Sequence, residues 1–447
     1  MESVADILGE AIIAGSPGHP LCPSRGGPTL PRCDSGRGTS GGARAGPRRY
    51  QVLRPRAARR YDATLGADGV GWEGGGGPAQ APVGAYAMVE ADVIVVGGGP
   101  AGGMAAWRLG PACRVVLLER ARLPRDKLCS GVLTRKSVEQ LRVAIDLEPV
   151  LIGQAEAGIR VTHGARGVFI APTAWPLLFA SRARMDQALL EAAARRGADV
   201  RERAAVVAVD AERGEVALAG GGRLRGRLVI GADGATGVCA LAVQGALPRA
   251  GVALEARIVD PRPTGQRWAI LDSRLPGGYF WAFPKWDGSV AIGGGTMRPT
   301  AGRGLRGAVA AWAARVAGAR LPERVRGHPV PCYGPRRAQA GRVLLTGDAA
   351  GLIDPLLGEG IPFALWSGRL AAEHALACLG GRAEPRGYGV ALSPLLAWQR
   401  PFRALLPQAD LLRRALSHRR VVGMGWRILV ERVPPVLQRE LAREGGL

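Results

Sequence analysis

A glycine-rich turn after an apolar run, residues 92–96, is the first place in the chain where residue types indicate chemistry. It reads Gly97-Gly98-Gly99-Pro100-Ala101-Gly102. The first glycine of such a turn makes the bend, the third lets the backbone approach a pyrophosphate, and the sixth lets the next helix pack closely. The start of that helix adds amide donors and the positive end of its dipole. We therefore predict a dinucleotide-binding turn made of Gly97, Gly99, Pro100, Ala101 and Gly102.

An acidic residue at the end of the next apolar run defines the kind of nucleotide. Glu119 follows residues 114–118 and lies 22 positions after Gly97, close to the ~20 expected of an acid that binds a ribose hydroxyl. A carboxylate at this place repels a 2'-phosphate, so we expect an adenosine with a free ribose. Arg120, the next residue, is included in the predicted nucleotide site.

Two further turns follow buried strands, and each carries an aspartate. Residues 228–230 lead into Gly231-Ala232-Asp233-Gly234, and residues 343–345 lead into a turn that contains Gly347-Asp348. An aspartate beside a helix N-terminus can bind a ribityl hydroxyl, and glycines bring backbone amides to a phosphate or a flavin edge. A single Asp-Gly pair is more typical of an ordinary turn. From these segments we predict cofactor contacts by Asp233, Gly234, Gly347, Asp348, Pro355, Gly358, Gly360 and Ile361.

Taken together, in this order and at these separations, the three turns resemble the FAD-binding fold of the para-hydroxybenzoate hydroxylase group. The resemblance spans residues 92–379 and includes Arg182 and Asp186, which match a helix start where the group's arginine approaches the cofactor. It implies FAD as the cofactor. The fold class that we expect is α/β, with a doubly wound, Rossmann-like FAD-binding domain, an antiparallel-sheet substrate domain and a helical C-terminal tail.

An aromatic stretch carries the information on substrate class. Residues 276–284 fit the pattern P-x-x-Y-x-W-x-F-P at every specified position, and this pattern is similar to the signature of the geranylgeranyl reductase family. On a strand, Tyr279, Trp281 and Phe283 would share one face and form an aromatic wall suited to a long apolar substrate. The alternative is an ordinary core stripe of a sheet. We predict catalytic roles for Tyr279 and Trp281.

A cysteine in the segment Lys127-Leu128-Cys129-Ser130-Gly131 is the third predicted catalytic residue. In the family, a Cys-Gly-Gly or similar segment occupies this loop, with its cysteine beside the substrate double bond. Cys129 fits that pattern, but Ser130 replaces the commoner glycine, which leaves the loop's shape and the role of the thiol open. The alternative is a buried, inert cysteine.

The family resemblance implies reduction of isolated double bonds in a polyprenyl lipid or isoprenoid chain, by hydride from reduced flavin. Only one dinucleotide turn is present, so NADPH would bind transiently as electron donor, and a ferredoxin-like protein is the other donor considered. The enzyme alternative is a flavin-dependent monooxygenase that hydroxylates an aromatic or isoprenoid substrate. A rival from another class is a flavin-bearing binding protein without catalysis. The substrate's identity and the oligomeric state stay open.

Alternating β and α segments predict how the chain is divided. The FAD-binding domain would comprise residues 88–250 and 330–390, together with part of the substrate region near residues 150–180. Residues 251–329 alternate apolar and polar side chains, which is typical of an antiparallel sheet. Residues 391–447 form an apolar and basic helical tail, which would lie on an anionic membrane surface or cap the substrate domain.

The first 87 residues differ in composition from the rest, since glycine and proline fill 27 of these positions. Such a segment cannot bury enough apolar surface to fold, so we predict a disordered, low-complexity leader. The simplest interpretation is an upstream sequence ahead of a native start at Met88. The alternative is a genuine regulatory or targeting arm.

The net charge and the cysteine content limit which binding partners and which cellular location we expect for this protein. The formal net charge is +23, but only three of the 60 basic residues are lysines, namely Lys127, Lys136 and Lys285. With 67 glycines, this indicates biased codon usage rather than a nucleic-acid-binding patch, and we predict no nucleic-acid partner. Seven scattered cysteines suggest reduced thiols, a cytoplasmic setting and no metal site. Peripheral membrane contact is the further expectation for the location.

Overall fold

A computed structural model describes residues 89–155, 158–163, 166–170, 177–263, 268–298, 304–323, 325–404 and 432–442. The leader, residues 1–87, lies outside the described residues, as does Met88, so the expectations for this segment stay predictions. Among the described helices, none combines the length and the apolar character needed to cross a bilayer.

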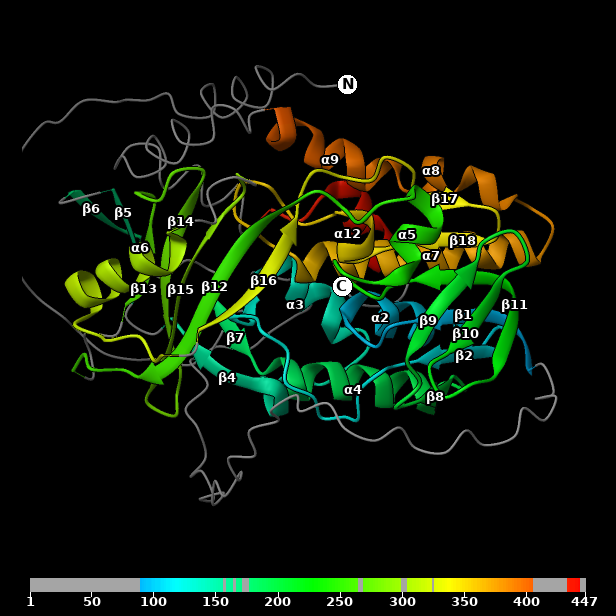
Figure 1. Ribbon diagram of the computed structural model, residues 1–447, viewed down its shortest axis with the longest axis horizontal. Coiled ribbons are helices and arrows are strands. Elements are labelled where there is room, and N and C mark those ends of the chain that lie inside the picture. The colour runs from blue at the N-terminus through cyan, green and yellow to red at the C-terminus, as the bar shows by residue number, and fades with distance from the viewer. Residues whose placement is uncertain are drawn as a thin grey trace, which may run out of the picture. The chain divides into compact units, whose positions relative to one another are not determined.

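The first sheet has eight strands, and its parallel core is the framework of the site (Figure 1). These strands are β1 (Val89–Val96), β2 (Val115–Leu118), β8 (Asp199–Arg201), β9 (Val206–Asp210), β10 (Glu215–Leu218), β11 (Arg223–Gly231), β17 (Gln339–Ala340) and β18 (Val343–Leu345). The main path runs β17-β18-β11-β1-β2-β8, and the β9–β10 hairpin pairs with β11. Pairing is parallel from β18 through to β8, which confirms the doubly wound prediction.

The register of the parallel strands brings the three predicted turns together. Val96 at the end of β1 is paired with Leu118 of β2 and with Gly231 of β11, and Gly231 is paired with Leu345 of β18. From β1 the chain continues to β2 on one side, whereas β11 is added on the other. The carboxyl end of β1 is therefore the switch point of the sheet, where ligands bind in open α/β sheets.

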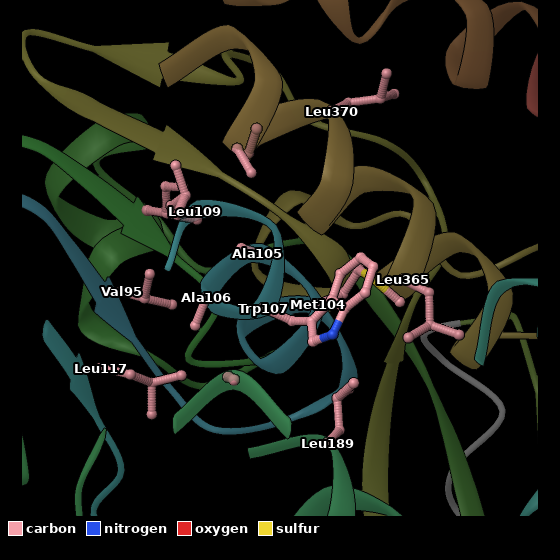
Figure 2. Packing of buried hydrophobic residues seen from close by; sticks show 14 of the residues in the cluster. Val95, Met104, Ala105, Ala106, Trp107, Leu109, Leu117, Leu189, Leu365 and Leu370 are labelled. Atoms are coloured by element: carbon pink, nitrogen blue, oxygen red, sulfur yellow. The ribbon is translucent and has the colours of Figure 1, made fainter. Parts of the chain in front are cut away.

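Helix α2 (Pro100–Leu109) packs closely between α4 (Arg182–Arg195) and α7 (Ile361–Leu379). Small residues permit this approach: a Cβ at Gly103 would lie 2.8 Å from the Leu189 side chain of α4, and one at Gly368 of α7 would lie 2.1 Å from the Ala101 carbonyl oxygen. Figure 2 shows side chains of β1, β2, α2, α4 and α7 gathered in this core. Helix α5 (Val238–Gln244) packs on β9, β17 and β18 instead.

A second sheet of seven strands has the order β16-β12-β15-β14-β13-β5-β6 (Figure 1). Its strands are β5 (Ile159–His163), β6 (Arg166–Ile170), β12 (Ala250–Val259), β13 (Ala269–Asp272), β14 (Gly278–Pro284), β15 (Ser289–Thr296) and β16 (Arg326–Pro331). All described pairs are antiparallel except β13 with β5. The parallel pair joins β13 to a strand from an earlier part of the chain. Helix α6 (Leu305–Trp312) packs on this sheet.

The remaining described elements connect the two large sheets or follow them. A small sheet is formed by β3 (Val132–Leu133), β7 (Leu178–Ala180) and β4 (Leu151–Gln154), and α3 (Arg135–Arg142) packs against α7. Short helical turns are η1 (Glu148–Val150), η3 (Ala313–Ala317), η4 (Gly347–Ala350) and η5 (Pro385–Gly387). The helical tail is described at α8 (Tyr388–Ala391), α9 (Ser393–Ala404) and α12 (Pro435–Ala442), and residues 405–431 of it lie outside the described residues.

Candidate functional site

A cavity of about 630 Å³ opens at the switch point and brings most of the predicted site residues together. Both the turns at the carboxyl ends of the parallel strands and the aromatic strand β14 line it. The predicted residues in its wall are Gly97, Gly99, Pro100, Ala101, Glu119, Arg120, Cys129, Arg182, Asp233, Gly234, Tyr279, Trp281, Asp348, Gly358, Gly360 and Ile361. Its volume falls within the range usual for cofactor and ligand sites.

Three residues predicted to contact the cofactor do not line this cavity. Gly102 is buried in α2, where a Cβ would lie 1.9 Å from the Gly97 carbonyl oxygen, so it serves the close packing of the turn. Gly347 has a φ of +53°, and its N–H donates to the Ser367 hydroxyl at 2.9 Å. Pro355 is buried outside the lining. These three residues therefore lie next to the cavity wall rather than in it, and their contact with the cofactor stays a prediction.

Glu119 holds the glycine-rich turn in place. The carboxylate is 4% exposed; its Oε2 accepts the Gly98 N–H at 2.8 Å and its Oε1 accepts the Ala121 N–H at 2.9 Å. The Arg125 guanidinium lies 3.4 Å from Oε1. Glu119 therefore joins the ends of β1 and β2, and its carboxylate stands at the cavity wall where a ribose hydroxyl would be bound.

The N-terminus of α2 and three cations fit the diphosphate of FAD. No side chain caps α2 at Gly99, so the amides of its first turn are available to a ligand. A Cβ at Gly99 would have only the Arg125 guanidinium within 4 Å, which leaves room for a group against the backbone. Lys127 and Arg182 line the same cavity. Backbone donors, a helix dipole and positive side chains are the features that bind phosphate groups.

The two predicted aspartates differ in their local roles. Asp233 Oδ2 accepts the Cys239 N–H at 2.9 Å and so caps α5, and burial raises the pKa of its carboxyl. Asp348 lies in η4 and faces a basic group that includes Lys127, Arg182 and His328. Burial raises the pKa of Asp348, and these cations partly oppose that effect. Asp348 is the better placed of the two to accept a ribityl hydroxyl.

A buried ion pair fixes Arg182 at the cavity. The Arg182 Nε and Nη2 each donate to an oxygen of Asp186 at 2.9 Å, one helical turn further along α4. Arg125 Nη1 lies 3.1 Å from the same carboxylate, which is 1% exposed. Helix α4 begins at Arg182, as the sequence pattern predicts. At this helix start the Ser181 side chain accepts the Arg184 N–H.

Strand β14 forms the apolar part of the cavity wall. Tyr279, Trp281 and Phe283 line the cavity, as their alternation predicts, whereas Phe280 faces the other way and stacks on Trp312 at 5.2 Å. The Tyr279 hydroxyl donates to the Leu357 carbonyl and joins β14 to the loop before Gly358. The three aromatic side chains therefore belong both to the sheet core and to the surface of the cavity.

Cys129 is exposed and lines the cavity, so the thiol is not buried. The Gly131 N–H donates to its sulfur at 3.4 Å, and the thiol lies near Arg182. A cysteine held at the wall of the cavity by its own loop is consistent with contact to a ligand. It stays a prediction that the thiol takes part in a reaction.

Sequence reasoning missed a buried acid and a buried base behind this loop. Glu255 of β12 is 9% exposed and accepts hydrogen bonds from the Trp281 indole N–H, at 2.8 Å, and from the Ser130 hydroxyl. Lys285 donates to the Ser130 carbonyl at 2.8 Å and lies 4.0 Å from the centre of the Phe179 ring. Burial lowers the pKa of Lys285 to about 7.

The rarity of lysine in the sequence is a signal that could have identified Lys285. Arginine fills all but three of the 60 basic positions, and each of the three lysines lies at the cavity or contacts its wall. Lys127 lines it, Lys136 pairs with the wall residue Glu359 at 2.9 Å, and Lys285 holds Ser130. A compact ammonium group is not replaced by a guanidinium in such packed positions.

We expect the free energy of unfolding to rise by a few kcal/mol as the pH is raised from about 7 to about 10.5. In this range the unfolded chain carries a protonated Lys285 and the folded chain a neutral one, so the unfolded state binds more protons. The destabilising effect of Lys285 is complete below about pH 7 and disappears above the pKa of 10.5. Urea unfolding of the wild type and of Lys285→Met across this range measures it; parallel curves for the two proteins would contradict the assignment.

Comparison with known proteins agrees with this geometry. A family model described as "FAD binding domain" matches residues 90–260. Digeranylgeranylglycerophospholipid reductase 1 of Methanopyrus kandleri is 31% identical over 314 residues, which cover 64% of this chain and 81% of that protein. Menaquinone reductase of Mycolicibacterium smegmatis is 33% identical over 316 residues (64% and 76%), and geranylgeranyl diphosphate reductase of Synechocystis is 30% identical over 315 residues (64% and 75%).

Solved structures share the fold at lower sequence identity. A geranylgeranyl bacteriochlorophyll reductase-like protein from Thermoplasma acidophilum superposes with a TM-score of 0.61 and 22% identity, covering 80% of this chain and all of that chain. The myxobacterial chondrochloren halogenase also gives 0.61, at 21% identity, covering 80% and 96%. Fold and cavity thus define an FAD-dependent oxidoreductase. Among such enzymes, the chain belongs to the geranylgeranyl reductase family.

Proposed function

We propose that this reductase saturates isolated double bonds in the polyprenyl chain of a lipid or isoprenoid. The observation that carries the proposal is the shared cavity, whose wall combines the nucleotide-binding turns with the aromatic face of β14. A ligand chain along Tyr279, Trp281 and Phe283 would be next to a flavin in the same space. FAD, when bound and reduced, supplies the hydride.

The chain's own residues bind and orient both molecules. Glu119, Asp348 and the turn at Gly97 hold the nucleotide and ribityl groups, and Arg182 approaches the diphosphate. Tyr279 and Trp281 hold the alkene and exclude water from it. Cys129, at the same wall, is proposed to lie beside the double bond. Each of these roles is proposed from the position of the residue at the cavity wall.

The substrate class is supported by the relatives' names, which refer to geranylgeranyl lipids, geranylgeranyl diphosphate and menaquinone. These compounds differ in their head groups but share a polyprenyl chain. An aromatic, apolar wall recognises the chain rather than the head group. We therefore assign the chain as the recognised part and leave the head group open.

The proposal extends to the electron donor and the location. With one dinucleotide-binding turn in the described part of the chain, NADPH would reduce the flavin during a transient encounter, and a ferredoxin-like protein is the other donor. A cytoplasmic enzyme with peripheral membrane contact would reach a lipid substrate, and none of the five cysteines of the described residues forms a disulfide. Flavin reduction by each donor in anaerobic solution distinguishes the two.

Incubation with a geranylgeranyl lipid tests the activity. We expect the purified, FAD-loaded enzyme with dithionite as reductant to yield a product heavier by two hydrogens for each double bond. Mass spectrometry of the extracted lipid measures this gain. A product heavier by one oxygen, formed only in air, would instead establish the monooxygenase alternative.

A further inference from the structure

Glu255 is a buried carboxyl group at the cavity wall whose orientation is fixed by its neighbours. It is paired across the second sheet with Gly293 of β15 and with Arg326 of β16. Because Gly293 has no side chain, the Trp281 indole lies over it, 2.6 Å from where a Cβ would be, and reaches the carboxyl group. The Ser130 hydroxyl, which belongs to the loop that carries Cys129, donates to the same carboxyl group.

The two hydrogen bonds favour one oxygen of the neutral acid as the site of its proton. The Trp281 N–H, which can only donate, and the Ser130 hydroxyl both contact Oε2. Because a carbonyl oxygen is the better acceptor of a carboxylic acid, these donors favour Oε2 as the carbonyl oxygen and Oε1 as the site of the proton. In the carboxylate, the same two donors stabilise the negative charge. The group is thus held in one orientation in both protonation states, as a proton donor must be.

Two charged side chains, Lys285 and Arg326, act on the Glu255 carboxyl group. Lys285 and Arg326 favour its carboxylate, and burial opposes this and raises the pKa of Glu255 above its ordinary value. Lys285 in turn faces Glu255, Arg257, Cys129 and Asp287, and its own pKa is lowered mainly by burial. Burial therefore favours the neutral form of each group of this pair, the carboxylic acid of Glu255 and the amine of Lys285.

We propose that Glu255 supplies the proton in double-bond reduction, oriented by Ser130 and Trp281. This inference rests on the proposed function. One alkene carbon receives a hydride, with both electrons, from reduced flavin, and the other receives the proton of Glu255 Oε1. The π bond breaks, two C–H bonds form, and Glu255 is left as a carboxylate that takes a proton from solvent. Ser130 and Trp281 act as positioning residues, and Glu255 acts as the acid.

The isosteric variant Glu255→Gln tests this assignment in single turnover. We expect its FAD content and its reduction by dithionite to match the wild type, and its reoxidation by a geranylgeranyl lipid to slow by about 100-fold or more. Glu384→Gln, a change of an exposed glutamate in a surface ion pair, is the matched control and should keep the wild-type rate. Wild-type reoxidation by the lipid in Glu255→Gln would overturn the inference.

The pH profile separates an acid from a structural residue. The wild-type rate should fall as the pH rises through the pKa of Glu255, because only the neutral acid donates. Ser130→Ala removes a donor to the carboxylate and so should move this fall to higher pH, whereas Glu255→Gln should show no such fall. A profile that is the same in all three proteins would contradict the role.

Two outcomes distinguish this inference from the function on which it rests. If geranylgeranyl lipids do not reoxidise the reduced wild-type enzyme, the proposed function fails, and the inference fails with it. If they do so equally in wild type and Glu255→Gln, only the inference fails. Infrared difference spectra of the apoprotein give a readout without turnover. One of the neutral-carboxyl bands that titrate in the wild type should be missing in Glu255→Gln, whereas those of Asp233 and Asp348 should remain. An unchanged set of bands would contradict the buried acid.

Discussion

Gly102→Ala should yield a protein without flavin and with a free energy of unfolding lowered by more than about 3 kcal/mol. The new Cβ would lie 1.9 Å from the Gly97 carbonyl oxygen and 3.2 Å from a Val95 methyl. The carbonyl belongs to the turn itself, so it can move only if the turn opens and α2 shifts away from β1. The flavin absorbance of the purified protein and urea unfolding of the apoprotein measure the two effects.

Gly99→Ala is the matched control within the same turn. Its Cβ would meet no atom closer than 4.0 Å, and its φ of −83° suits alanine. We expect this variant to fold with nearly wild-type stability but to bind FAD at least about 10-fold more weakly, because the methyl group occupies space at the α2 N-terminus. Equal flavin binding by Gly102→Ala and the wild type would contradict the packing role of Gly102.

Asp186→Ala should cost about 3 to 5 kcal/mol of stability, the second large effect that we expect. Its carboxylate is 1% exposed and pairs with Arg182 at 2.9 Å and Arg125 at 3.1 Å. Its removal leaves two neighbouring guanidinium groups without their shared anion. Arg182 also loses its fixed position at the cavity, so FAD should bind more weakly. The urea midpoint of the apoprotein and a flavin titration measure these changes.

Asp199→Ala provides the comparison for this ion pair. Asp199 pairs with Arg201 at 2.7 Å in β8, but its side chain is 51% exposed. Solvent screens such a pair, so its loss should change stability by less than about 1 kcal/mol. If the two substitutions had equal effects, burial would not be the source of the strength of the Asp186 pair.

Much of the fold could be predicted because its signals are local in sequence. A glycine turn after an apolar run, as at Gly97, specifies strand, turn and helix within a dozen residues, and β18 has the limits predicted for residues 343–345. The pairing of β5 with β13 could not be predicted. The two strands are about 110 residues apart in sequence, and neither contains a sequence pattern that indicates which strand it pairs with.

The candidate site divides in the same way. Glu119 and Asp348 stand at strand ends, where spacing alone indicates a ligand, and the structure places both at the cavity. Glu255 lies within an ordinary alternating strand, so nothing near it in sequence distinguishes it from a surface residue. Its role depends on Ser130, 125 positions away, and on the space left by Gly293. Such a contact is visible only after folding.

Anaerobic reoxidation of the reduced flavin tests the central claim most directly, that one cavity holds a flavin and a polyprenyl chain side by side. The enzyme is reduced with dithionite, freed of excess reductant and mixed with a geranylgeranyl lipid or its fully saturated counterpart. We predict that the flavin absorbance returns only with the unsaturated lipid, which gains two hydrogens for each flavin oxidised. Flavin that stays reduced with both lipids and is reoxidised by oxygen, faster when lipid is present, would contradict the account.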